Sequence, residues 1–81
     1  MTPAQLNETI MDIQHVSSMH KRIAIILNAE DEGHTAIYDI PDFNTVQALR
    51  MTKTGCLKIP YNGYMVYVPP ESIAFIKFYS N

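Results

Sequence analysis

The side chains best suited to catalysis or metal binding in this chain are three histidines and one cysteine. His15 and His20 lie five residues apart, whereas two histidines that bind one metal ion from the same face of a helix lie four apart. His34 follows the acidic run 30–32, but this spacing matches no calcium-binding loop. We therefore expect no metal site.

Acid–base and nucleophilic catalysis are equally weakly supported. Asp12 with His15 and His20 resembles a general-base cluster, but basic groups near the end of a helix are explained by the helix macrodipole. Cys56 would need a positioned base to act as a nucleophile, and the sequence supplies none. The three glycines fall at turns and helix ends and form no phosphate-binding loop. The sequence predicts a protein that is not an enzyme, with no catalytic residues and no cofactor.

The length and composition indicate one small globular domain. Its 81 residues leave room for a single domain spanning residues 1–81. A hydrophobic content of 47% with 17% charged residues is typical of a folded chain and excludes bulk disorder. The longest apolar run, 23–27, is too short to cross a bilayer, and no secretory signal is visible. A single cysteine excludes an internal disulfide and fits a reducing compartment, so we expect a cytoplasmic protein.

Residues 3–19 are expected to form an amphipathic helix. Thr2 is suited to the N-cap position, Pro3 to the first helical position, and Gln5 completes a capping box with Thr2. Apolar residues then recur at helical spacing, which predicts one buried stripe. These residues are Leu6, Ile10, Ile13 and Val16.

The middle of the chain predicts two strands and a second helix. Residues 22–28 are β-branched and apolar on both faces, which indicates a buried strand. Residues 35–40 alternate and are expected to pair with that strand as a hairpin with a longer loop. Residues 42–54 fit either a short helix capped by Asp42 or Asn44, which we favour, or a strand, because several of them are β-branched.

The strongest local signal is the segment 61–64, Tyr-Asn-Gly-Tyr. Asn-Gly between two alternating apolar runs predicts a hairpin with a type I′ turn, since both central residues need positive φ. A two-residue loop fixes the register of the strands 56–61 and 64–68. The expected pairs are Tyr61 with Tyr64, Pro60 with Met65, Ile59 with Val66, Lys58 with Tyr67 and Leu57 with Val68.

Pro60 predicts the position of the first hairpin strand in the sheet. Proline has no backbone N–H to donate, so strand 56–61 is expected at a sheet edge. We expect an α+β fold of two layers, with two helices covering one face of a five-stranded, mostly antiparallel sheet. The expected strand order is 56–61, 64–68, 72–79, 22–28 and 35–40.

The sheet face opposite the helices is expected to be too apolar for a simple solvent-exposed surface. It would mix aromatic rings, methionine and lysine, and the first two are enriched at protein interfaces. Alternatively, the sheet could curl into a small barrel that hides both faces. The candidate partner-binding residues are Lys58, Met65, Tyr67, Phe75, Lys77 and Tyr79.

These observations favour a protein-interaction module that binds and regulates or inhibits a partner protein as a homo-oligomer. Small chains of this kind are often accessory or defence-inhibiting proteins of phages and mobile elements. One alternative is binding of RNA or single-stranded DNA through aromatic rings and lysines, against which stand the net charge of −2 and the lack of an RNA-binding motif. A second alternative is a small ligand or nucleotide bound between subunits. No membrane partner is expected.

Overall fold

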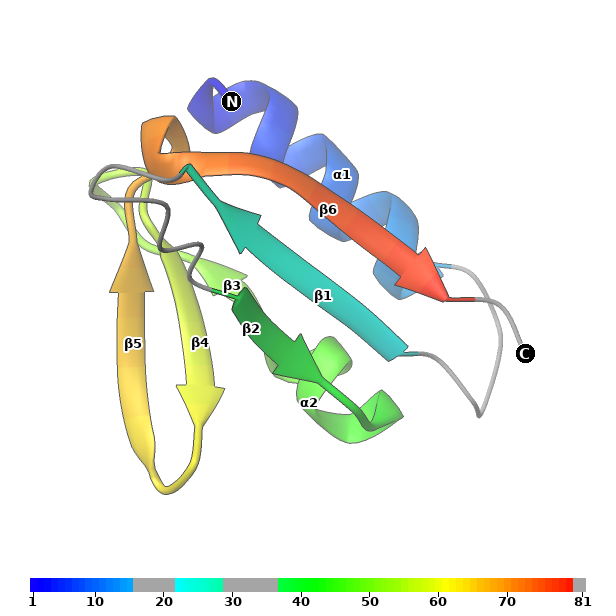
Figure 1. Ribbon diagram of the computed structural model, residues 1–81. Helices are drawn as coiled ribbons and strands as arrows, with labels where there is room; N and C mark the ends of the chain where they lie inside the picture. Colours follow the sequence, from blue (N-terminus) through cyan, green and yellow to red (C-terminus); the bar gives the residue numbers. More distant parts are fainter. Residues whose placement is uncertain (16–21, 29–36, 80–81) are drawn as a thin grey trace.

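The protein is a mixed α+β structure with two helices and two small antiparallel sheets (Figure 1). The computed structural model describes residues 1–15, 22–28 and 37–79. The elements are α1 (Pro3–His15), β1 (Arg22–Leu27), β2 (Ile37–Ile40), α2 (Phe43–Ala48), β3 (Arg50–Met51), β4 (Leu57–Tyr61), β5 (Tyr64–Val68), the 3₁₀ turn η1 (Pro70–Ser72) and β6 (Ile73–Tyr79).

The six strands form two three-stranded sheets, ordered β2-β1-β6 and β3-β4-β5. The expected pairing of β1 with both β2 and β6 is confirmed. The single five-stranded sheet is wrong, because β5 and β6 lie in different sheets. The separation occurs at η1, where Ser72 N–H donates to the carbonyl of Pro69 at 3.0 Å. Two consecutive prolines enter this turn, so the chain leaves β5 without folding back on it.

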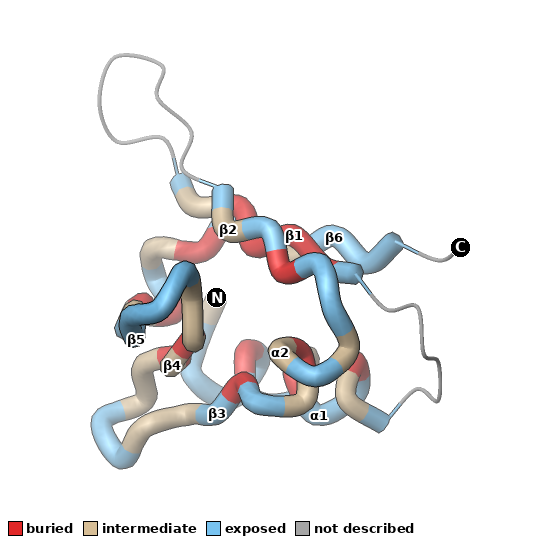
Figure 2. The backbone as a smooth tube through the Cα atoms, turned by 90° about the horizontal axis from the view of Figure 1, so that it is seen from below, coloured by how far each residue is buried: buried red, intermediate tan, exposed pale blue. Residues whose placement is uncertain are grey.

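The helices and the two sheets enclose one hydrophobic core (Figure 2). Helices α1 and α2 lie on one side of it, the sheet β2-β1-β6 lies opposite them, and the sheet β3-β4-β5 closes a flank. Burial of the apolar stripes of all three layers is the main stabilising contribution. The core residues are Leu6, Ile10, Ile13, Ile23, Ile25, Ile40, Val46, Leu49, Leu57, Ile59, Val68 and Ile73.

Helix α1 begins with the expected capping box. Thr2 N–H donates to Gln5 Oε1 at 2.9 Å, and Gln5 N–H donates to Thr2 Oγ1 at 3.1 Å. Leu6, Ile10 and Ile13 of its predicted apolar stripe are buried in the core. The helix is described to His15, and residues 16–19 of the expected helix lie outside the described part of the chain.

Helix α2 is shorter than expected, because the region 42–54 is part helix and part strand. Asp42 is the N-cap, and its Oδ1 accepts from Thr45 N–H at 2.7 Å. Gln14 of α1 ends the helix, since its Nε2 donates to the carbonyls of Val46 at 3.0 Å and Leu49 at 2.9 Å. The chain then extends into β3, so both structures considered for this region occur in succession.

The hairpin β4–β5 has the five residue pairs that a two-residue loop dictates, from Leu57 opposite Val68 to Tyr61 opposite Tyr64. Asn62 and Gly63 both have positive φ, at 49° and 83°. The outermost position expected for the first hairpin strand is wrong, because β4 lies between β3 and β5. Strand β3 pairs only with positions 57 and 58, so its ladder ends before the proline at position 60.

Candidate protein-interaction surface

The face of the sheet β2-β1-β6 that points away from the helices is here called the outer face. Ile23 and Ile25 of β1 belong to the core, so the alternate residues of β1 point to the outer face. The register aligns them with neighbours on both sides, which gives three rows across the strands. The rows are Ile37–Ile26–Phe75, Asp39–Ala24–Lys77 and Arg22–Tyr79.

One row of the outer face is entirely apolar. Ile26 in its centre is only 8% exposed, whereas Ile37 and Phe75 beside it are 49% and 48% exposed. Apolar side chains that flank a buried residue and remain half in solvent form a continuous patch across three strands. This row is the apolar part of a candidate contact surface.

The other two rows carry charge, and both lie on the same side of the apolar row. Arg22 Nη2 lies 3.9 Å from Asp39 Oδ1, and its guanidinium carbon lies 4.9 Å from the centroid of the Tyr79 ring. Both side chains of the ion pair are about half exposed, so the pair contributes little to stability and remains available to a partner. Among the described residues, no acidic group lies within ion-pair distance of Lys77.

Strand β6 combines the sequence of a central strand with the position of an edge strand. Apart from Lys77, its residues Ile-Ala-Phe-Ile-Lys-Phe-Tyr are apolar on both faces, as in strands that are covered on both sides. In the described part of the chain it is nevertheless the outer strand of its sheet (Figure 1). Ile73 alone is buried and Ile76 is half-buried, while Phe78, on the helix side, is still 42% exposed. A long apolar edge is a surface on which another strand can pair.

The six residues predicted to bind a partner do not share one surface. Phe75, Lys77 and Tyr79 lie on the outer face of β6. Lys58, Met65 and Tyr67 lie on the sheet β3-β4-β5, on the side opposite its core residues. The expectation of a common face depended on pairing between β5 and β6, and these strands flank different sides of the core (Figure 2).

The second group of predicted residues forms part of a basic and aromatic row. The register places Arg50 opposite Lys58 and Lys58 opposite Tyr67, whose side chain is 57% exposed. Arg50 Nη1 donates to the carbonyls of Gln47 at 2.6 Å and Leu49 at 2.8 Å. Part of its hydrogen-bonding capacity is therefore used within the protein.

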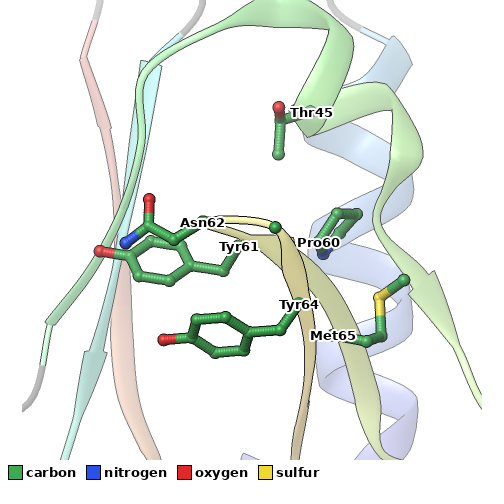
Figure 3. A pocket seen from close by; sticks show the side chains of 7 residues that line it. Thr45, Pro60, Tyr61, Asn62, Tyr64 and Met65 are labelled. Carbon is green, nitrogen blue, oxygen red and sulfur yellow. The ribbon is translucent and has the colours of Figure 1, made fainter.

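An open hollow of about 460 Å³ lies at the tip of the hairpin (Figure 3). The rings of Tyr61 and Tyr64 extend to the same side of the hairpin, and Thr45 faces the hollow from α2. None of its seven lining residues is charged, so the hollow offers ring faces and hydroxyl groups but no acid–base pair. The lining residues are Thr45, Pro60, Tyr61, Asn62, Gly63, Tyr64 and Met65.

The residues first considered for catalysis are not brought together in the described part of the chain. No group of three or more His, Cys, Asp or Glu side chains there is arranged to hold a metal ion. His20 and His34 lie outside the described residues, and His15 is exposed. Neither described helix is long and apolar enough to span a membrane.

Arg22, Ile37 and Asp39 also lie on the outer face, and they were not predicted from the sequence. The alternation of residues 35–40 already placed Ile37 and Asp39 on one face of their strand. It did not indicate that this face is the outer one, since that depends on the register with β1.

A comparison of the chain with protein families, with curated proteins and with solved structures finds no match.

Proposed function

We propose that this protein is a non-enzymatic interaction module that binds and regulates or inhibits a partner protein, and that it does so as a homo-oligomer. The observation that supports the proposal is β6, an apolar seven-residue strand at the edge of its sheet with five exposed residues. Association at this strand would cover the side chains and satisfy the backbone groups that such an edge leaves open.

The outer face extends this edge into a surface with the composition of a protein interface. Two aromatic rings, two isoleucines and one arginine lie around the small Ala24, and both charged rows lie on the same side of the apolar row. Aromatic and arginine side chains carry most binding energy in protein complexes. Regulation follows if the bound surface of the partner is the one that it uses for its own activity.

The test is capture of a partner by the immobilised protein, with variants on the two sheets compared. Phe75→Ser and Tyr79→Ser remove rings from the outer face, whereas Tyr67→Ser removes a similarly exposed ring from the other sheet. We expect one protein from the source cell to be retained by the wild type and by Tyr67→Ser and lost by the β6 variants. The captured protein is then purified and its activity measured with and without the module. Equal capture by all variants would overturn the proposal.

A second candidate function is binding of single-stranded nucleic acid by the other sheet. The row of Arg50, Lys58 and Tyr67 places two cations beside an exposed ring, as in surfaces that stack bases and contact phosphates. The net charge of −2 weighs against it. Fluorescence anisotropy with labelled oligonucleotides at low salt tests it, since binding should weaken with added salt and in Lys58→Glu. A flat titration would exclude it.

A further inference from the structure

We infer that β6 pairs antiparallel with β6 of a second copy of the chain, about a two-fold axis that runs midway between Lys77 of one copy and Lys77 of the other. The two β2-β1-β6 sheets then become one six-stranded sheet. This inference rests on the proposed function, since it specifies how the module associates with itself. Two-fold dimers are the commonest protein assemblies, and their interface must be complementary to itself.

A β-bulge near the start of β6 defines the segment that is free to pair. Ile26 of β1 lies opposite Phe75 and Leu27 lies opposite Ile73, so Ala74 is an extra residue in β6. A bulge bends the strand and disrupts a regular edge. Residues 75–79 beyond it continue in regular register with β1 and form the regular edge.

The symmetry of the dimer restricts the register further. A two-fold axis perpendicular to the sheet keeps the outer faces of both copies on the same side. Residues of β6 then pair only with residues of the same face, so one residue must lie opposite its own copy, and the axis runs between these two. An axis at position 77 pairs all of the segment 75–79. Axes at positions 76 and 78 leave part of it without a partner.

The register centred on Lys77 also matches the side chains. On the outer face, Phe75 lies opposite Tyr79 of the second copy, and aromatic cross-strand pairs are favourable. On the helix side, Ile76 lies opposite Phe78 of the second copy, so both half-covered apolar side chains gain a partner. The exposed rings at positions 75, 78 and 79 are thus accounted for by one contact.

Lys77 is the one unfavourable position in this register, because it lies opposite Lys77 of the second copy. Like charges directly opposite each other weaken strand pairing. Lysine in the middle of an edge strand is a common means of limiting strand association. The dimer is therefore expected to be reversible and to strengthen when the two ammonium groups are screened or neutralised.

A charge-exchange experiment tests the position of the axis. Lys77→Glu has the same like-charge conflict as the wild type when it pairs with itself, but a mixed dimer places Lys opposite Glu. We expect native mass spectrometry of an equimolar mixture to show more mixed dimer than random exchange gives. Lys58→Glu, which changes an equivalent charge on the other sheet, should exchange at random with the wild type. Random exchange in both mixtures would overturn the register.

Sedimentation equilibrium of Lys77→Gln tests the same register through the dissociation constant of the dimer. The substitution removes the repulsion and keeps the length of the side chain, so the dissociation constant of the dimer should fall about two- to fivefold. Lys58→Gln is the control. Circular dichroism establishes that each variant is folded. A dissociation constant that is unchanged in Lys77→Gln would contradict the placement of this residue on the axis.

Cysteine cross-linking identifies the pairing directly, in a Cys56→Ser background. Lys77→Cys should form a disulfide between copies, because a residue on the axis lies opposite itself. Phe78→Cys, exposed but opposite Ile76, should not. If Phe78→Cys forms the disulfide and Lys77→Cys does not, this register is wrong, although the self-association of the protein is still supported. A protein that stays monomeric at high concentration overturns β6 pairing and the homo-oligomer part of the proposed function, whereas partner capture tests the binding of a partner protein separately.

Discussion

Tyr38 and Tyr61 meet edge to face, with ring centroids 5.1 Å apart and ring planes at 85°. Tyr38 lies on β2 and Tyr61 on β4, so the contact joins the two sheets. Tyr61 also contacts Tyr64 at 6.3 Å and 79°. The backbone ladders are confined to each sheet in the described part of the chain, so side chains such as these hold the hairpin against the first sheet.

A double-mutant cycle on this pair measures the coupling between the sheets. Tyr38→Leu and Tyr61→Leu keep apolar bulk and remove the ring contact, which is worth about 0.5–1.5 kcal/mol beyond burial. We expect the free energies of unfolding in urea to be non-additive by that amount. The control cycle pairs Tyr38 with Tyr67, whose ring is on the opposite side of the hairpin, and it should be additive. Additive values in both cycles would show that the sheets are joined elsewhere.

Gln14 is expected to be the polar side chain on which the junction of the two helices depends most. Its side-chain amide donates to the carbonyls at the end of α2, and its backbone carbonyl accepts from Gln47 Nε2 at 2.9 Å. Gln14→Met keeps the volume and leaves those helix-end carbonyls without this donor, at a cost of about 1–3 kcal/mol in unfolding free energy. Asn7→Ala on the exposed side of the same helix should change it by less than about 0.5 kcal/mol. Equal effects of both substitutions would refute this role.

Gly63→Ala and Gly55→Ala should destabilise the fold by similar amounts. Gly63 has φ of 83° with no atom within 4 Å of an added Cβ. Gly55 has φ of 88°, and the added Cβ would lie at an ordinary contact distance of 3.5 Å from Pro3. Only the left-handed backbone is penalised at both sites, which costs about 1–2 kcal/mol each. Chemical denaturation measures both, and a much larger loss for Gly55→Ala would mean that its contact with Pro3 is repulsive.

Short-range signals predicted a helix cap and a turn of this fold because the physical causes of these features are local. The capping box of Thr2 and Gln5 and the turn at Asn62-Gly63 depend on residues at most three apart, and the structure contains both. The end of α2 was not predictable, because the side chain that donates to its last carbonyls, Gln14, lies more than 30 residues earlier in the chain. No local pattern indicates such a contact.

The sequence predicted which residues share one face of a strand, but it did not predict which strands share a sheet. Alternation assigned Tyr67 to one face of the hairpin and Phe75 to one face of the last strand. Whether those faces join depends on how the chain crosses positions 69–72, where a 3₁₀ turn separates the two strands. Hydrophobic periodicity carries no information about that crossing. The exposure of β6 follows from the same crossing, since pairing with β5 would have covered its edge.

The thermal stability of the wild type should depend on protein concentration if β6 associates. A dimer that unfolds to two separate chains gains stability by mass action, which raises Tm by about 3–5 °C for each tenfold increase in concentration. Phe75→Glu should abolish this dependence, because it places a carboxylate in the paired edge. Tyr67→Glu introduces the same group at a similarly exposed ring on the other sheet and should retain it. Circular dichroism melts over a hundredfold range of concentration measure the effect. A wild-type Tm that is constant over this range would contradict the self-association of β6.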